Sequence, residues 1–292
     1  MSSQPQKVES FNSNLRVAVL MACHNRKNKT VQCLESLYAA KPSHWDLKIY
    51  LVDDGSTDGT SGAVEQFDPM IQIIKGNGEW YWAFSMYQAE MSIKESCDAI
   101  LWLNDDTKLE IDSIERIHNQ FVLNRDSVLI GQFRSSLNNT LTYGGLVKYD
   151  KHPFHFKPVY ARDTLISADT FNGNLVFIPI AISKAIGPID GEFAHAYADI
   201  DYGLRARAQG VKIGVIPGFI GICETNPQPK YRSLTEELKG LLRVKATPLK
   251  SQIRFLKRHG GIFLVVFIVT PFFRVLLLKI KASIYSKTIR CQ

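Results

Sequence analysis

The sequence predicts an α/β fold in which helices flank a mainly parallel, mixed sheet. Apolar runs rich in Val, Ile and Leu alternate with stretches of helical spacing, which is typical of βαβ units. Polar clusters follow several of these runs, at strand ends where such sheets bind ligands. No linker-like segment interrupts residues 15–238, so we expect one domain there, between a disordered N-terminus (1–14) and a distinct C-terminal segment (239–292).

The first predicted unit consists of a strand, a helix and a second strand. Residues 15–22 (LRVAVLMA) form a short apolar run of the kind found in buried strands. Apolar residues then recur at helical spacing within 29–40. A second apolar run covers 47–52, and the Gly-, Ser- and Asp-rich segment 53–59 predicts a turn after it.

The next unit repeats this order. A short helical stretch leads to a predicted strand at 70–74, and a Gly- and Trp-rich loop at 76–82 precedes a predicted helix at 83–94. The run AILWL at 99–103 predicts a buried strand, which ends at Asn104-Asp105-Asp106.

The second half of the domain is less regular. Several short strand-like runs within 127–179 are separated by Gly, Asn and Pro. A helix is predicted at 199–209, where Gly210 ends it, and a strand at 211–216, where Pro217 ends it.

Polar clusters at successive strand ends are expected to meet in space, because parallel strands end at one edge of a sheet. These clusters are His24-Asn25-Arg26, Asp53-Asp54 and Asn104-Asp105-Asp106. Asp105 and Asp106 are suitable ligands for Mg²⁺ or Mn²⁺, which take carboxylate oxygens together with substrate phosphates. Alternatively, the Asp-Asp-Thr segment starts a turn or caps a helix.

The segment 53–59 (DDGSTDG) is open to two interpretations. It is a turn, in which Asp58 caps the following helix. Alternatively, one carboxylate accepts hydrogen bonds from a base or a ribose. The segment lacks the GK[ST] ending of a Walker loop and the GxGxxG pattern of a dinucleotide site.

The ordered set of motifs resembles the opening half of family 2 glycosyltransferases. The segments are VAVLMACHNRKNKTVQCLESL, IYLVDDGSTDGT and ILWLNDDT. The loop GNGEWYWA resembles a segment of members related to rhamnosyl- and galactofuranosyltransferases, and FNGNLVFIPIAISKAIGPIDGEFAHAYADIDYGLRARAQG is similar to the acceptor-side region. The similarity covers roughly residues 15–225.

The resemblance implies the GT-A fold and a set of site residues. Asp106 falls on the main metal ligand and Asp105 beside it on a ribose or metal contact; Asn104 departs from the strict Asp-x-Asp spacing. The nucleotide-sugar site is expected to comprise Ala22, Asn25, Arg26, Asp53, Asp54, Gly76, Asn77, Gly78, Trp82 and Asp105. The acceptor side is expected to comprise Trp80, Asn172, Gly173, Asn174, His195 and Asp201.

The catalytic base of the family falls on Asp199, within an Ala-Asp-Ile-Asp segment whose Ala198 replaces a Glu of the family pattern. A carboxylate there would take the proton of the attacking acceptor hydroxyl, and direct displacement would invert the anomeric configuration. Alternatively, Asp199 caps the helix and Asp201 pairs with Arg205 at i, i+4. A helix N-terminus would weaken Asp199 as a base, and apolar neighbours would offset this effect.

Aromatic residues and glycines in the loop at 76–82 have two interpretations as well. Trp80, Tyr81 and Trp82 are core residues, or they form a wall for the donor sugar or the acceptor. Gly76 and Gly78 would let the backbone approach a phosphate closely.

Charge is distributed unevenly along the chain. Of the 35 Lys and Arg residues, twelve lie from Lys239 onward with no Asp or Glu, which leaves 23 basic against 28 acidic residues before that point. The uncharged run 260–273 has basic flanks and contains Pro271, so we expect interfacial attachment to an anionic membrane rather than a spanning helix. A buried core helix is the alternative, and nucleic acid is a poorer match.

The predicted function is therefore inverting, metal-dependent transfer of a sugar from a UDP- or dTDP-linked donor to a saccharide or lipid-linked acceptor in cell-surface polysaccharide assembly. The five cysteines are odd in number and irregularly spaced, which argues against a disulfide framework, and the N-terminus is polar. Both features favour the cytoplasmic face of the membrane. The alternatives are a sugar-phosphate nucleotidyltransferase, which should carry a Gly-rich loop after the first strand, and a catalytically degenerate sugar-binding protein.

Overall fold

Four parallel strands from the first third of the chain form one half of the central sheet of the computed structural model. They are β1 (Leu15–Cys23), β2 (Trp45–Asp53), β3 (Gln72–Lys75) and β4 (Ala99–Leu103). The structure describes residues 14–193, 196–225, 249–261 and 264–266. His195, the predicted disordered N-terminus up to residue 13, and most of the predicted C-terminal segment lie outside these ranges.

The other half of the sheet is mixed. Its strands are β5 (Lys108–Leu109), β6 (Ser127–Arg134), β7 (Leu141–Tyr143), β10 (Ile166–Ser167), β12 (Leu175–Pro179) and β13 (Lys212–Ile222). The order is β10-β13-β6-β12-β4-β1-β2-β3, with β5 on β13 and β7 on β6. Because β12 runs antiparallel to β4, the amino end of β12 lies at the carboxyl end of β4.

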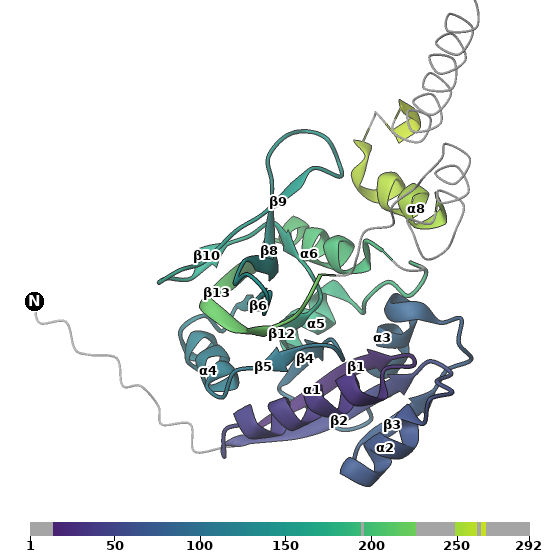
Figure 1. The fold of residues 1–292 in the computed structure, drawn as a ribbon. Coiled ribbons are helices and arrows are strands. Elements are labelled where there is room, and N and C mark those ends of the chain that lie inside the picture. The colour runs from purple at the N-terminus through teal and green to yellow at the C-terminus, as the bar shows by residue number, and fades with distance from the viewer. Residues whose placement is uncertain (1–13, 194–195, 226–248, 262–263, 267–292) are drawn as a thin grey trace, which may run out of the picture.

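A small antiparallel sheet, β11-β8-β9, is added beside the main one. Its strands are β8 (Gly145–Lys148), β9 (Phe156–Pro158) and β11 (Thr170–Phe171). The main sheet lies between two layers of helices, as expected for the predicted class (Figure 1).

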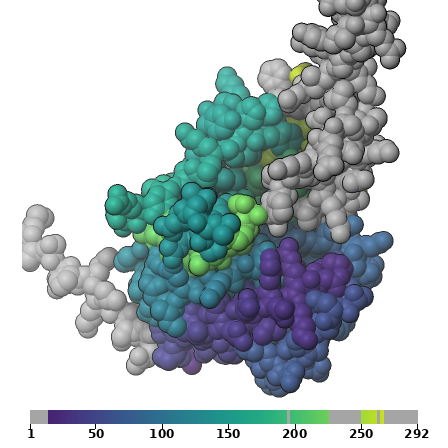
Figure 2. Space-filling view, viewed as in Figure 1, coloured from purple at the N-terminus to yellow at the C-terminus, as the bar shows by residue number. Residues whose placement is uncertain are grey.

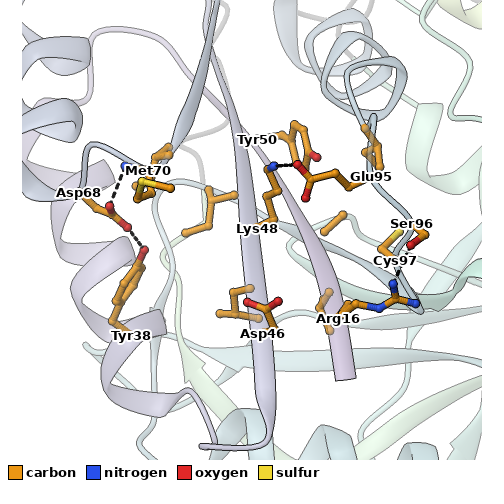
Figure 3. Close-up of a pocket in the computed structure, with 16 residues that line it drawn as sticks. Arg16, Tyr38, Asp46, Lys48, Tyr50, Asp68, Met70, Glu95, Ser96 and Cys97 are labelled. Atoms are coloured by element: carbon orange, nitrogen blue, oxygen red, sulfur yellow. Dashed lines mark hydrogen bonds and ion pairs between the residues drawn. The ribbon is translucent and has the colours of Figure 1, made fainter. Parts of the chain in front are cut away.

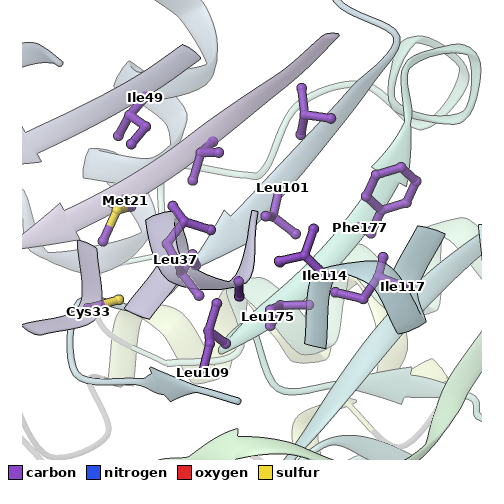
Figure 4. Close-up of a cluster of buried hydrophobic side chains, with 14 of the residues drawn as sticks. Met21, Cys33, Leu37, Ile49, Leu101, Leu109, Ile114, Ile117, Leu175 and Phe177 are labelled. Carbon is purple, nitrogen blue, oxygen red and sulfur yellow. The ribbon is translucent and has the colours of Figure 1, made fainter. Parts of the chain in front are cut away.

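One face of the sheet is covered by α1 (Lys27–Ala40), α2 (Thr60–Phe67) and α4 (Ser113–Leu123). Their apolar residues pack against alternate residues of the strands, including Met21, Ile49, Leu101 and Phe177 (Figure 4). Cys33 and Leu37 of α1 lie in this cluster with no exposed surface, which explains the helical spacing of apolar residues in the sequence.

The other face is covered by α3 (Tyr81–Met91), α5 (Ile180–Ile186) and α6 (Ala198–Ala208). The intervening strand residues, such as Leu20 and Trp102, point into this second cluster. Phe255 of a C-terminal helix, α8 (Leu249–His259), is also fully buried there. Part of the predicted C-terminal segment therefore packs onto the domain.

The prediction that Pro217 ends its strand is wrong. β13 continues to Ile222, and its pairing with β6 shifts register between Val215 and Phe219. Proline has no N–H to donate, so it is tolerated at such an irregularity. Arg116 stabilises the bend, because its guanidinium donates to the carbonyl oxygens of Pro217 and Phe219.

The first and second halves of the chain occupy adjoining regions of one surface (Figure 2). Within the described residues, none of the helices is both long enough and apolar enough to cross a bilayer. Val265 and Val266, from the predicted interfacial run, are 68% and 56% exposed.

Candidate functional site

A cavity of about 550 Å³ lies at the carboxyl ends of β1 and β4 and at the amino ends of β12 and α6. Residues that follow β1, β2 and β4 meet there, as the strand-end argument predicts, and the segments 172–174 and 196–200 join them. The predicted site residues that line it are Ala22, Arg26, Asp54, Gly78, Trp82, Asp105, Asp106, Asn172, Gly173, Asn174 and Asp199.

Asp105 and Asp106 follow β4, and one guanidinium holds them together. Arg26 Nη1 donates to Asp105 Oδ1 at 2.9 Å and to Asp106 Oδ2 at 2.8 Å. Burial raises the pKa of Asp105 to about 6, the negative charge of Asp106 acts in the same direction, and the charge of Arg26 opposes both. The Cys223 thiol approaches the other oxygen of Asp106 at 3.7 Å.

This donor set fits a divalent cation that shares its coordination with a diphosphate. Two neighbouring carboxylates are the usual protein contribution to such sites, and phosphates and waters complete the shell. Among the described residues, no group of three or more His, Cys, Asp or Glu side chains gathers around a common point. Arg26 supplies the positive charge between the two carboxylates in this structure.

A continuous chain of contacts connects these carboxylates to Asp199. The backbone N–H of Asn104 donates to the carbonyl oxygen of Asn174 at 2.9 Å, which fixes the start of β12 against the end of β4. The next residue back, Gly173, donates its N–H to Asp199 Oδ2 at 3.0 Å. Asp199 therefore faces the same cavity as Asp105.

Asp199 is half-buried in the first turn of α6, where Tyr197 is the N-cap residue and has no capping side-chain bond. Asp199 Oδ1 accepts the N–H of Ile200 at 2.8 Å. Burial raises the pKa of Asp199, and the hydrogen bonds from Gly173 and Ile200 offset this only in part. Desolvation of the Asp199 carboxylate therefore outweighs these backbone hydrogen bonds.

Asp54 organises the loop before α3. Its Oδ1 accepts the N–H groups of Gly78 at 2.8 Å and Trp80 at 3.3 Å, and its Oδ2 accepts that of Tyr81 at 2.9 Å. The side chain is 5% exposed. Asp54 therefore lines the cavity while its oxygens hold the loop backbone.

Trp82 forms a wall of the cavity against Gly173. The indole Nε1 donates to Asn104 Oδ1 at 2.9 Å. A Cβ atom at position 173 would lie 2.6 Å from the Trp82 ring and 3.4 Å from Asp199 Cβ. Only glycine therefore allows this approach between the ring, the β12 start and Asp199.

Two predicted donor-side residues serve the turn after β2 instead of lining the cavity. Asp53 is 2% exposed, and its carboxylate accepts the Ser56 N–H at 2.9 Å and the Ser61 hydroxyl. Asn25 has a φ of 51° and accepts the Thr57 N–H at 2.8 Å. Both hold the turn that the sequence offered as the alternative interpretation.

Three residues of the Gly- and Trp-rich loop also lie outside the cavity lining. A Cβ at Gly76 would lie 2.6 Å from Asp54 Oδ1, so this glycine makes room for the carboxylate rather than for a phosphate. Asn77 accepts the N–H of Glu79 at 2.9 Å. Trp80 packs edge-on against Phe84, with ring centroids 5.3 Å apart, as in the core interpretation.

Asp201 points away from the acceptor side. It is fully buried, and its Oδ2 accepts the Arg205 Nε–H at 2.9 Å, so the i, i+4 pair considered from the sequence is present. Arg258 and His259 also bond to it. Burial alone would raise the pKa of Asp201, but these hydrogen bonds outweigh it and lower the pKa.

Sequence reasoning missed several residues of the cavity. The lining also includes Cys23, His24, Tyr81, Ser85, Asn104, Tyr143, Ala196, Tyr197, Ala198 and Ile200. His24 and Asn104 belong to the polar clusters that the sequence predicts at the strand ends, although neither is among the predicted site residues. Tyr143 comes from β7, a three-residue strand without any sequence pattern.

A second, smaller pocket of about 230 Å³ lies at the opposite end of β1 and β2 (Figure 3). Several of its polar side chains bond to partners within or beside the pocket. Arg16 bonds to Asp98 and Ser96, Lys48 pairs with Glu95, and the Tyr38 hydroxyl donates to Asp68. This pocket holds none of the predicted site residues.

Comparisons with known proteins agree with this architecture. The family model described as glycosyl transferase family 2 matches residues 18–177. A crystal structure of GalNAc-T7 with UDP, GalNAc and Mn²⁺ superposes with a TM-score of 0.58 at 14% identity, covering 79% of this chain and 48% of that one. Crystal structures of S. aureus TarS give 0.57 for the longer form and 0.56 for residues 1–349, both at 14% identity.

The alignments cover only part of each of these structures. Each TarS alignment covers 85% of this chain, but 44% of the longer form and 72% of the shorter one. The chain thus spans about half the length of the first two structures, and identity at this level shows a common GT-A-like fold. No curated protein sequence matches the chain.

Proposed function

Because this chain belongs to glycosyl transferase family 2, an inverting family whose model covers more than half of its residues, we propose that it transfers a sugar from a nucleoside-diphosphate donor to an acceptor hydroxyl. The observation that carries the proposal is the single cavity that Asp105, Asp106 and Asp199 share. The family match favours this function over the nucleotidyltransferase alternative.

Asp199 is the proposed general base. A single carboxylate that faces the cavity can take the acceptor proton during direct displacement, which inverts the anomeric carbon. Its raised pKa suits this role, because a more basic carboxylate accepts the proton more readily. The bonds from Gly173 and Ile200 fix the direction in which its oxygens point.

Asp105 and Asp106 would hold Mg²⁺ or Mn²⁺, which when bound would neutralise charge on the leaving diphosphate. Arg26 lies between the two carboxylates and would supply a positive charge to a phosphate bound beside them. Ala22 and Gly78 border the same side of the cavity, where we place the nucleotide. Trp82 and Asn172 border the side of Asp199, where we place the sugar and the acceptor.

The acceptor and the cellular site belong to the proposal as well. We expect a saccharide or lipid-linked saccharide of a cell-surface polysaccharide, at the cytoplasmic face of a membrane, with a rhamnosyl or galactofuranosyl donor among the first to try. The basic, apolar sequence after Gly260 supports attachment to an anionic surface.

Release of nucleoside diphosphate from a panel of UDP- and dTDP-sugars, with Mg²⁺, Mn²⁺ or chelator, tests the function. We expect slow release from one donor, dependent on the metal and faster with acceptor. Asp106→Ala should abolish the effect of metal on donor affinity measured by calorimetry. Binding of a donor with no release from any under all conditions would point to the catalytically degenerate protein instead.

A further inference from the structure

The helix α8 packs against Tyr197, the residue that precedes α6 and the proposed base Asp199. Phe255 has no exposed surface. Its ring centroid lies 5.2 Å from that of Tyr197 and 5.3 Å from that of Phe154. Tyr197 lines the cavity, and Asp199 follows two residues later. The aromatic cluster therefore joins α8 to the cavity wall through one side chain.

Tyr197 has a backbone conformation that needs support from its surroundings. Its φ of 74° lies in the left-handed region, which costs a non-glycine residue roughly 1 kcal/mol or more. Its carbonyl oxygen accepts the N–H of Asp201 at 2.8 Å, so this conformation sets the direction in which α6 begins. Burial raises the pKa of Tyr197, and a hydrogen bond with Gln252 of α8 opposes the rise.

Ion pairs attach α8 to the domain at two carboxylates. Arg258 Nη1 bonds to both oxygens of Asp201 at 2.6 and 2.7 Å, and its Nη2 bonds to Asp190 at 2.9 Å. Arg254 also donates to Asp190, at 2.8 Å. A fully buried carboxylate such as Asp201 requires such partners, since an unpaired charge would be costly there.

The two attachments act on the same turn of α6. The aromatic contact holds Tyr197, the residue before the helix, and the ion pair holds Asp201, in its first turn. Asp199 lies between them. A change in either contact would shift the Asp199 carboxylate relative to Gly173 and to the acceptor side of the cavity.

We propose that α8 is a positioning element for the general base, with Phe255 and Arg258 as its positioning residues. The inference rests on the proposed function. Within the described residues, the contacts of α8 reach Tyr197, Asp190 and Asp201, which precede or begin α6, rather than Arg26 and the Asp105–Asp106 pair. Loss of α8 packing should therefore impair transfer and acceptor binding while leaving donor affinity intact.

The test uses full-length Phe255→Ala and Arg258→Gln, with Lys257→Ala as the matched control because Lys257 is exposed on the same helix. We measure kcat for transfer, acceptor KM, donor Kd by calorimetry and thermal stability. For Phe255→Ala we expect kcat to fall about ten- to hundredfold and acceptor KM to rise, with donor Kd within about twofold, because a displaced base loses its alignment. Phe255→Leu, which keeps an apolar side chain, should recover part of the rate.

Hydrogen exchange supplies a readout that does not depend on turnover. The amides of residues 198–201 should exchange faster in Phe255→Ala and Arg258→Gln than in wild type or Lys257→Ala. If Phe255→Ala does not fold, Phe255→Leu and Arg258→Gln carry the test. Wild-type kcat and acceptor KM in the folded variants, or a parallel loss of donor affinity, would overturn the inference; failure of wild type to turn over any donor would instead overturn the proposed function.

Discussion

Asp199 is subject to two opposing effects on its carboxylate. Burial raises its pKa, while N–H donors from Gly173 and Ile200 lower it, and the net direction is upward. The sequence could suggest both effects but could not decide between them, because the extent of desolvation depends on the packing of residues remote in sequence. The sequence around Asp201 could not decide its pKa either, because two of its partners, on α8, lie 57 and 58 positions away.

Replacing Asp199 by Asn should lower kcat about a hundred- to ten-thousandfold, because an amide cannot accept the acceptor proton. Donor affinity should stay within about twofold, since Asp105 and Asp106 are unchanged. Transfer assays and donor calorimetry on the same preparation check both. Transfer at the wild-type rate would exclude Asp199 as the base.

The raised pKa of Asp199 also predicts the acidic limb of the pH profile. The base must be deprotonated, so kcat should rise as the pH increases through the pKa of Asp199 and fall as the pH decreases below it. The midpoint should lie above the ordinary aspartate value of about 3.9. A profile of kcat at saturating donor, acceptor and metal measures it; a limb at or below the ordinary value would contradict the desolvation argument.

Gly173→Ala tests the close approach between Trp82 and β12. The new Cβ would lie 2.6 Å from the indole, so the ring must move and transfer should fall about tenfold or more. Gly62→Ala is the control, because nothing lies within 4 Å of a Cβ at that exposed helical position. The control should keep full activity and gain a few tenths of a kcal/mol in stability; equal activity of both variants would argue against the wall.

At the scale of elements, the buried strands of the first half are the features that the sequence predicts best. The run at 99–103 matches β4. The strand predicted at 15–22 extends by one residue at its end, and the strand predicted at 47–52 extends by two residues at its start and one at its end. A fully buried strand is apolar throughout, so its sequence alone delimits it. The strands β10 and β11 have two residues each, which is too short for an apolar run to delimit them in the sequence.

Pro217 shows why a local rule fails in a longer context. A proline interrupts the hydrogen bonding of a regular strand, but β13 changes register there and resumes at Phe219. The guanidinium that holds the bend comes from Arg116, about a hundred residues earlier in the chain. That contact carries no signal in the sequence around position 217.

The loop before α3 should depend on Asp54. In Asp54→Asn, an amide N–H₂ group would face one of the N–H donors of the loop, so the free energy of unfolding should fall by about 1–3 kcal/mol and donor affinity should weaken. Denaturant titration and donor calorimetry measure the two effects. Glu79→Gln, at an exposed position of the same loop, is the control; identical stability of both variants would refute the role of Asp54.

At the scale of the whole molecule, α8 sets where the chain can be shortened. A chain ending at Val266 retains Phe255, Arg254 and Arg258, so it should stay folded and release nucleoside diphosphate at the wild-type rate. It should lose binding to vesicles that contain anionic lipid. A chain ending at Pro248 should have a lower melting temperature, because it leaves Asp190 and Asp201 without these arginines.

Sedimentation with vesicles and thermal denaturation distinguish the two truncations. Continued vesicle binding by the chain ending at Val266 would place the membrane contact elsewhere. Equal melting temperatures of the two chains would show that α8 contributes little to the domain.

The insertion of β12 between β4 and β6 has a consequence for biosynthesis. On the ribosome, β4 can pair with β1 as soon as both have emerged, but its other edge waits for Leu175, some seventy residues later. At translation rates of about 5–20 residues per second, the apolar edge AILWL stays open for several seconds. During this interval the nascent chain exposes an unpaired apolar strand edge, which favours aggregation. Slower elongation or a shortage of chaperones should therefore lower the yield of native enzyme more than the stability of the folded protein would indicate.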